Sequence, residues 1–392
     1  MTPALGFGIN TRAGRERKPA AGRRTMPPEP PTSTPKLPPA RVARAVERVR
    51  HHVGRLYQRL APPPITVIDM VFGAFLSQAI SASAQLGIAD ALAEGPLTKE
   101  DLARRIGADP DSVARLMRLL ISRGVFRRRR DGRFALNALA DTLRSDSPIS
   151  TRGVALLYGS PQHRANWTRL AEAVRTGEPN PPKVFGKDVF GYLREDPEFA
   201  EIFNSAMTST SAVLEAAVVA AYDFSNFGVI ADIGGGHGRL LSSLLAAAPD
   251  ARGVLFDLPE AVEGAPPILA AHGVADRVTV TGGSFFESVP SADAYVMKNV
   301  IHDWPDDEAI AILGTIKAAA PPGAKLLLLE MVVPDHAREF LGHYADMEML
   351  VMAGALERSR KQWTDLLQRG GFRLQRVVQT AGPLCVIEAV AG

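Results

Sequence analysis

Cysteine is almost absent from this 392-residue chain. The single Cys385 excludes an internal disulfide and a cysteine-rich metal site, and it fits a reducing, cytoplasmic setting. The first residues, MTPALGFG, lack a charged segment followed by an apolar core, so no secretory signal is expected. No apolar run is expected to reach membrane-spanning length, because the best candidate, Ile65–Leu92, contains Asp69, Gln78 and Gln85. These absences predict a cytoplasmic protein without a membrane partner.

Negative charge exceeds positive charge outside the N-terminal segment. Residues 1–60 contain thirteen Lys and Arg against three Glu, a net charge of +10, so the remaining 332 residues carry −7 of the total of +3. A mildly acidic body argues against a nucleic-acid partner for the whole protein. Residues 1–40 are rich in proline and arginine and have no apolar period, which predicts a disordered basic tail in which Met26 could be the true start.

Residues 41–150 predict a helical domain that ends in a winged helix. Apolar residues three and four apart indicate amphipathic helices, and Thr98 and Asp109 are candidate helix caps. DNA binding and dimerisation are both compatible with the winged helix, and the enzyme-like half that follows favours dimerisation. The expected elements are helices over Arg41–Leu60, Ile65–Leu92, 98–105 and 109–123, then a hairpin of Val125–Arg128 and Arg133–Leu136.

The second half of the chain predicts an α/β domain. Residues 151–222 predict connecting helices that contribute to a substrate pocket, with breaks at 177–182 and 186–191. Strands and helices then alternate over 223–392, which predicts a Rossmann-like, mostly parallel sheet with helices on both faces and an antiparallel hairpin at one edge. The strands are expected at Val229–Asp232, Val254–Phe256, Val278–Thr281, Ala294–Met297, Lys325–Met331 and two C-terminal segments, and the helices from Gly238 and over 259–272, 306–320 and Gln362–Arg369.

The segment ADIGGGHG follows the first of these strands and predicts a ligand site. Gly234, Gly236 and Gly238 form G-x-G-x-G, where bare backbone and a helix N-terminus can meet a ligand. A dinucleotide fingerprint needs its third glycine at the position of Arg239, and the lysine of a phosphate P-loop is absent. A diphosphate ligand is therefore not favoured.

Two aspartates further limit the chemical class of ligand that the glycine segment is expected to bind. Asp257 ends the second strand, nineteen residues after Gly238, where an acid can bind both hydroxyls of a ribose. Asp232 precedes the glycines and would repel a phosphate but suits a cationic group. A ribose with a cationic, phosphate-free arm describes S-adenosylmethionine. The plainer alternative is a tight turn with a structural aspartate.

Five segments occur in the order and spacing of a known family: ADIGGGHG, GVLFDLPEAV, GGSFFESVP, VMKNVIHDWPDDEAIAIL and LLLEMVVPD. From Ile65 to the C-terminus the chain resembles the plant caffeic acid O-methyltransferases and their bacterial hydroxyneurosporene and polyketide relatives. The resemblance implies a class I methyltransferase fold with a seven-stranded sheet and an intertwined homodimer formed by the winged-helix domain. It also implies methyl transfer from S-adenosylmethionine, without a metal, to a hydroxyl of a small aromatic or polyketide-like acceptor.

The resemblance implies the roles of individual residues. His302 in IHDW would be the general base, with Glu330 and Glu357 orienting it, and Asp303 would cap the next helix. Ser284 departs from the aspartate of the plant enzymes, which predicts weaker cofactor binding. The cofactor contacts would be Asp232, Gly234, Gly236, Asp257, Leu258, Ser284, Phe285, Lys298 and Met207. The acceptor contacts would be Asn299, Asp346, Met349, Met352, Trp167 and Phe203, with Tyr158 and Met347 as further candidates.

Three other functions remain compatible with the sequence. A homologue that binds S-adenosylmethionine but acts as a decarboxylase or hydroxylase typically lacks the base, and this chain has one. A winged-helix regulator would bind DNA and sense S-adenosylmethionine with its C-terminal domain. A scaffold would bind no cofactor at all.

Overall fold

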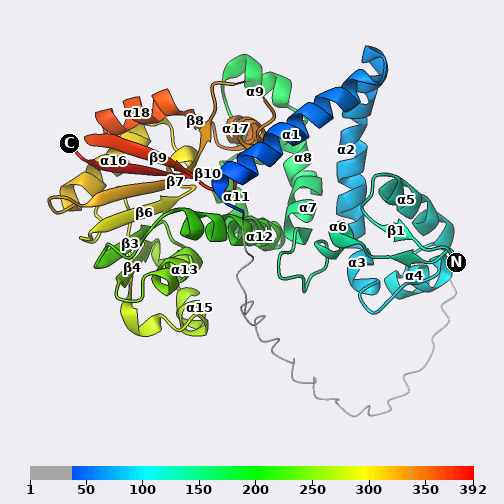
Figure 1. Ribbon diagram of the computed structural model, residues 1–392, viewed down its shortest axis with the longest axis horizontal. Helices are drawn as coiled ribbons and strands as arrows, with labels where there is room; N and C mark the ends of the chain where they lie inside the picture. Colours follow the sequence, from blue (N-terminus) through cyan, green and yellow to red (C-terminus); the bar gives the residue numbers. More distant parts are fainter. Residues whose placement is uncertain (1–37, 337) are drawn as a thin grey trace, which may run out of the picture.

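The computed structural model describes residues 38–336 and 338–392. The tail predicted over 1–40 therefore lies, apart from its last three residues, outside the described part. A twisted sheet with its helices occupies one side of the molecule and a small helical module the other, and long helices run between them (Figure 1). The N-terminal helices α1 and α2 form an arm that crosses the connecting helices.

The arm consists of α1 (Ala40–Arg59) and α2 (Pro63–Gln85), separated by the predicted proline break. The expectation of one helix over Ile65–Leu92 is wrong at its end, because Gly87 adopts a left-handed conformation with φ of 62°. A separate turn of helix, α3 (Ile88–Ala91), follows.

The helical module has the predicted helix–helix–hairpin order. It contains α4 (Lys99–Ile106), α5 (Pro110–Ser122), the hairpin of β1 (Arg127–Arg128) and β2 (Phe134–Ala135), and α6 (Ala138–Asp141). Thr98 Oγ1 accepts from the backbone N–H of Asp101 at 3.1 Å, and Asp109 Oδ1 from that of Ser112 at 2.8 Å, so both predicted residues cap their helices. Met117, Leu120 and Phe126 fill the core of the module.

By length and composition alone, two of the described helices are long and apolar enough to cross a membrane. The expectation that no apolar run reaches membrane-spanning length is therefore wrong. The two helices are α2 and α12 (Pro197–Ala221). Although α2 contains Asp69 and two glutamines, its most apolar stretch still has a mean hydropathy of 1.6. Only 11% of its most apolar stretch is buried, so α2 presents an apolar surface that a partner could cover.

Five shorter helices connect the module to the sheet before α12. They are α7 (Arg152–Gly159), α8 (Pro161–Trp167), α9 (Leu170–Thr176), α10 (Pro181–Phe185) and α11 (Val189–Glu195). The two predicted breaks are shorter than expected, since α10 and α11 begin inside them. Helix α7 packs directly on α2, where a Cβ at Gly159 would collide with the Ser81 side chain.

The C-terminal half forms one sheet in the order β5-β4-β3-β6-β7-β10-β9, and its mostly parallel character with an antiparallel edge agrees with the sequence prediction. Strands β3 to β7 are parallel, and β10 and β9 form the antiparallel edge. The predicted helix over 259–272 is split near Gly264. The strands are β3 (Val229–Ile233), β4 (Arg252–Asp257), β5 (Val278–Gly282), β6 (Ala294–Lys298), β7 (Lys325–Val333), the short β8 (Arg358–Ser359) beside β7, β9 (Phe372–Gln379) and β10 (Leu384–Ala391). The helices are α13 (Arg239–Ala247), α14 (Pro259–Val262), α15 (Ala265–Ala271), α16 (Asp306–Ala319), α17 (Leu341–Met352) and α18 (Arg360–Arg369), with 3-10 turns at Ala275–Arg277 and Ile301–Asp303.

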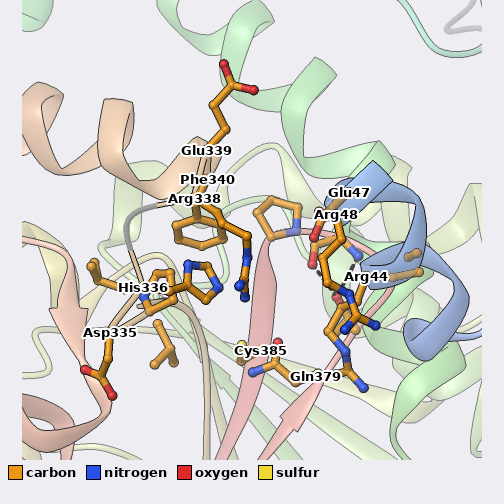
Figure 2. A pocket seen from close by; sticks show the side chains of 18 of the residues that line it. Arg44, Glu47, Arg48, Asp335, His336, Arg338, Glu339, Phe340, Gln379 and Cys385 are labelled. Atoms are coloured by element: carbon orange, nitrogen blue, oxygen red, sulfur yellow. Dashed lines mark hydrogen bonds between the residues drawn. The ribbon is translucent and has the colours of Figure 1, made fainter. Parts of the chain in front are cut away.

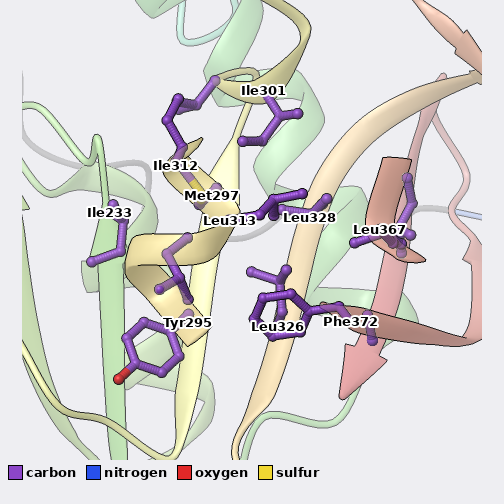
Figure 3. Close-up of a cluster of buried hydrophobic side chains, with 14 of the residues drawn as sticks. Ile233, Tyr295, Met297, Ile301, Ile312, Leu313, Leu326, Leu328, Leu367 and Phe372 are labelled. Atoms are coloured by element: carbon purple, nitrogen blue, oxygen red, sulfur yellow. The ribbon is translucent and has the colours of Figure 1, made fainter. Parts of the chain in front are cut away.

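Alternate residues of the strands fill two separate cores, one on each face of the sheet. Leu326 and Leu328 of β7 pack under α16 and α18, whereas Leu327 and Leu329 pack toward α12 and α13. The first core is drawn in Figure 3, where Tyr295 of β6 lies beside side chains of α16. Because both faces are buried, the strands are held rigidly and the loops at their carboxyl ends have fixed positions.

Candidate functional site

The glycine loop lies between β3 and α13, at the carboxyl edge of the sheet. Gly234, Gly236 and Gly238 have φ angles of 74°, 54° and 77°, which residues other than glycine rarely adopt. A Cβ at Gly235 would lie 2.6 Å from Leu255 Cδ1 and 2.7 Å from Asp232 Cγ, whereas one at Gly236 would meet nothing within 4 Å. The loop is packed on its inner side and open on its outer side, as a ligand cradle requires.

Asp257 at the end of β4 holds this loop in place. Its Oδ2 accepts from the backbone N–H of Gly236 at 2.8 Å, and its Oδ1 accepts from that of Leu258 at 2.7 Å. Each carboxylate oxygen has a further lone pair, so the side chain can still accept from two ligand hydroxyls. Asp257 therefore joins the glycine loop to the candidate ribose site.

Three charged side chains meet beside the glycines. Asp232 is buried, and one of its oxygens has no hydrogen-bond partner among the described residues. Burial raises the pKa of Asp232 to about 7, although the charge of Lys298 opposes that shift. Lys298 Nζ donates to Glu215 Oε1 at 2.7 Å. This arrangement leaves a desolvated carboxylate facing the loop, which a cationic ligand group would stabilise.

Two cavities border the loop and share Gly234 and Lys298. The smaller, of about 270 Å³, is lined by Met207, Asp232 and the glycines, among others. The larger, of about 770 Å³, will be called the large cavity; of the predicted site residues, its walls include Gly234, Asp257, Leu258, Ser284, Phe285, Lys298, Asn299 and Met352. All nine predicted cofactor contacts thus line one or both of these two cavities.

His302 lies on the short turn after β6, with its side chain 11% exposed. Its Nδ1 is 2.7 Å from Glu357 Oε1 and 3.9 Å from Glu330 Oε2, and its Nε2 is 3.5 Å from Asp303 Oδ1. With Nδ1 donating to Glu357, Nε2 is the nitrogen that remains to accept a proton. The sequence prediction that the base and both acids come together therefore matches the geometry.

The charges around His302 change its basicity. Burial alone lowers the pKa of His302, but the negative charges of Glu330, Asp303 and Glu357 outweigh burial and raise this pKa to about 10. Burial raises the pKa of Glu330 to about 7, against the opposing charge of His302. The imidazole is therefore a stronger base than the side chain of free histidine. The protonated ring has a pKa close to that of a phenol.

The backbone around the base is pinned by buried polar groups. Glu330 Oε1 accepts from the N–H groups of Val300 and Ile301 at 3.2 and 3.0 Å. Arg358, which is 1% exposed, donates to the carbonyls of Ile301 and Trp304. These bonds fix the turn that carries His302 from both ends, so Glu330 acts on the backbone of the base as well as on its charge.

The predicted acceptor residues do not all line the same cavity. Asn299 and Met352 line the large cavity, and Met349 and Met347 are half-buried on α17. Asp346 Oδ1 accepts from the backbone N–H of Glu357 at 2.9 Å, and this hydrogen bond positions Glu357. Phe203 packs in an apolar cluster with Leu157 and Phe199.

Trp167 and Tyr158 belong to a third cavity, of about 580 Å³, between α2, α8 and α17. This Glu348 cavity is lined by Ala74, Ser77, Tyr158, His163, Arg164, Trp167, Thr168, Met331, Leu341, Tyr344, Ala345 and Glu348. It shares no lining residue with the large cavity, but its Trp167 packs in the same apolar cluster as Met352 of the large cavity.

Sequence reasoning missed several of these residues. Glu215 and Glu348 are acids within mostly apolar helices, a signal that could have marked them. Nothing in the sequence marked Arg358 as a buried residue, because an arginine in a charged stretch is normally exposed to solvent. Gly235 was passed over because the motif counts only alternate glycines.

A further hollow of about 330 Å³ lies between α1 and the segment after β7 (Figure 2). Arg44, Glu47 and Arg48 face His336 and Arg338 across it, so its walls carry both signs of charge. It shares no lining residue with the cavities at the glycine loop. We therefore place the functional site at the loop.

His302, Glu330 and Glu357 could also serve as metal ligands, since one ligand atom from each lies within 4.8 Å of the others. The expectation of a metal-free site thus stays a prediction. The short His302–Glu357 hydrogen bond already occupies the Nδ1 position that a metal would need.

Comparison with known proteins is consistent with this site. The family model of the O-methyltransferase domain matches residues 167–373, and that of the O-methyltransferase dimerisation domain matches residues 68–146. The chain is 40% identical to the phenazine O-methyltransferase PhzM of Lysobacter antibioticus, over 82% of this chain and 95% of that protein.

Two solved structures agree with the fold. The structure of LaPhzM has a TM-score of 0.80 and 39% identity, and it covers 85% of this chain and all of its own. The structure of NcsB1, an O-methyltransferase from neocarzinostatin biosynthesis, has a TM-score of 0.69 and 30% identity, with 81% and 96% of the two chains covered. That protein was solved with S-adenosylmethionine and 2-hydroxy-5-methyl naphthoic acid.

Proposed function

Because the chain belongs to the O-methyltransferase family, we propose that it methylates a hydroxyl group of a small aromatic or polyketide-like acceptor with His302 as general base. The observation that carries this proposal is the His302–Glu357 contact of 2.7 Å next to Asp303, which lines a cavity that also borders the glycine loop. The enzyme is an S-adenosylmethionine-dependent O-methyltransferase of the class I fold. The acceptor and the roles of individual residues are the proposed part.

The residues present fit S-adenosylmethionine. Asp257 would accept from both ribose hydroxyls while it holds Gly236, and the unpartnered oxygen of Asp232 would stabilise the positive methionine end. Ser284 and Phe285 would border the adenine in the large cavity. When bound, the cofactor supplies an activated methyl group, so the protein must orient an oxygen and remove its proton.

His302 would perform the proton removal. Its Nε2 would accept the proton of the acceptor hydroxyl, and Glu357 and Glu330 would stabilise the imidazolium. A base with a pKa of about 10 matches a phenol, which has a similar acidity, better than an aliphatic alcohol. This match favours a phenolic or enolic acceptor.

We also propose a homodimer through the arm and the helical module. The apolar side chains of α1 and α2 are largely exposed, and residues 68–146 match a dimerisation domain. A second copy of the chain would cover this surface, which is large for a monomer. The exposed residues are Val42, Val46, Val49, Val53, Leu56, Leu60, Ile65, Val67, Ile68, Met70, Val71, Phe72 and Phe75.

The first test is calorimetric titration of the protein with S-adenosylhomocysteine, alongside Asp257→Asn. The substitution keeps the shape of the side chain but removes its charge and one acceptor oxygen, so affinity should fall about tenfold or more. Methyl transfer to a panel of hydroxylated aromatics then tests the reaction, with excess EDTA to test the metal-free expectation. Absence of wild-type binding would contradict the cofactor assignment and favour the scaffold.

A further inference from the structure

The wall of the Glu348 cavity carries one acid, among lining residues that are otherwise apolar, aromatic, hydroxyl-bearing or basic. The Glu348 side chain is 16% exposed. Its Oε2 accepts from Trp167 Nε1 at 2.6 Å, and His163 Nε2 lies 3.0 and 3.1 Å from its two oxygens. The carboxylate is thus held in a fixed orientation at the cavity wall by side chains of α8.

The two side chains that hold Glu348 are one ring nitrogen of His163 and the indole N–H of Trp167. His163 Nδ1 is buried and has no hydrogen-bond partner in the described part of the chain. Arg164 also lines the cavity but forms no ion pair with Glu348 among the described residues. A mostly desolvated anion therefore faces an apolar space.

The position of this anion relates it to the reaction site. Leu341, Tyr344, Ala345 and Glu348 line the cavity from one face of α17, and Met352, one turn further on that face, lines the large cavity. Met331 of its wall directly follows Glu330. Met352 of the large cavity and Trp167 of the Glu348 cavity belong to one apolar cluster, so an acceptor whose hydroxyl lies at His302 would reach Glu348 past these two side chains.

On the basis of the proposed function, we infer that Glu348 selects acceptors that carry a donor nitrogen, an amine or ring N–H, on the end of the ring system away from the methylated hydroxyl. The nitrogen would donate to a free lone pair of Glu348, and the aromatic body would lie against Tyr158 and Trp167. Such a charge-assisted bond replaces the water that the carboxylate loses on burial. A carboxylate at the same place on the acceptor would be repelled.

The test uses the full-length protein saturated with S-adenosylhomocysteine and a matched set of naphthols. Calorimetry compares 1-naphthol with its positional amino isomers and with hydroxynaphthoic acids. At least one aminonaphthol should bind about tenfold or more tightly than 1-naphthol. In Glu348→Gln this preference should fall to within about threefold, since a neutral amide is a weaker acceptor, while affinity for 1-naphthol is kept.

Further variants separate selection from structure. Trp167→Phe removes one donor to Glu348 but leaves its charge, so the preference for the amine should remain. Circular dichroism and S-adenosylhomocysteine affinity report whether each variant folds. If the wild-type protein does not bind S-adenosylhomocysteine, the proposed function fails, and that result is distinct from failure of the Glu348 inference. The inference is overturned if no naphthol binds, if no amino isomer exceeds 1-naphthol, if hydroxynaphthoates bind best, or if the preference survives in Glu348→Gln.

Discussion

His302 Nδ1 and Glu357 Oε1 lie 2.7 Å apart, and the side chain of the glutamate is completely buried. This contact fixes which nitrogen of the imidazole remains to accept a proton. It also depends on Asp346, which holds the backbone N–H of Glu357 at 2.9 Å, so the acid is positioned by α17. His302, Glu357 and α17 are therefore one connected unit.

Replacing His302 should separate binding from chemistry. We expect His302→Ala to lower kcat by about 10²- to 10⁴-fold, because the acceptor proton has no base, while S-adenosylhomocysteine affinity stays near that of the wild type. Glu357→Gln should give a smaller loss, since the amide keeps a hydrogen bond but can favour the wrong tautomer. Steady-state kinetics and calorimetry check both variants. A His302→Ala enzyme with nearly wild-type kcat would show that another group removes the proton.

The reaction should become faster as the pH rises above neutrality. A pKa raised to about 10 means that His302 is mostly protonated at pH 7, and only its neutral form accepts a proton. Below this pKa, kcat/KM should increase by up to about tenfold for each pH unit. Asp303→Asn removes one of the charges that raise the pKa, so its profile should shift to lower pH. A profile that is flat between pH 7 and 9 would contradict the raised pKa.

Gly235 should tolerate no side chain. In Gly235→Ala the new Cβ would meet Leu255 and Asp232 at 2.6 and 2.7 Å, and the loop would have to move away from Asp257. We expect a loss of about 1–3 kcal/mol in the free energy of unfolding, together with weaker S-adenosylhomocysteine binding. The matched control is Gly314→Ala in α16, where a Cβ meets nothing within 4 Å and helix propensity improves. Equal denaturation midpoints for the two variants would refute the packing argument.

Local patterns predicted the sheet, the glycine loop and Asp257, whereas the other candidate site residues came from the resemblance to the family. Strand alternation placed β3, β4, β6 and β7, and these strands brought the glycine loop, Asp257 and His302 to one edge, because carboxyl ends of parallel strands meet there. The sequence could not predict pairings between distant residues, such as Lys298 with Glu215 or His163 with Glu348. Those contacts depend on how α8, α12 and α17 pack over the sheet.

The end of the second helix shows a different limit. Apolar residues continue past Gln85, and the pattern therefore predicted one helix to Leu92, although the left-handed turn at Gly87 ends it. A glycine within an apolar stretch can continue a helix or terminate it, and tertiary packing decides which occurs. The same stretch appeared too polar to span a membrane, yet α2 passes that test by composition.

The exposed face of α2 should hold the dimer together. Phe72 and Phe75 stack at 5.4 Å on this face and are 49% and 64% exposed. Placing a charge there should prevent burial of the face against a second copy, so Phe75→Asp should shift the protein toward a monomer in light scattering. Val174→Asp on α9, an exposed apolar position outside the match to the dimerisation domain, is the control and should leave the mass unchanged. A dimer that survives Phe75→Asp at low micromolar concentration would mean that the two copies associate through a different surface, and the apolar face of α2 would then need another partner.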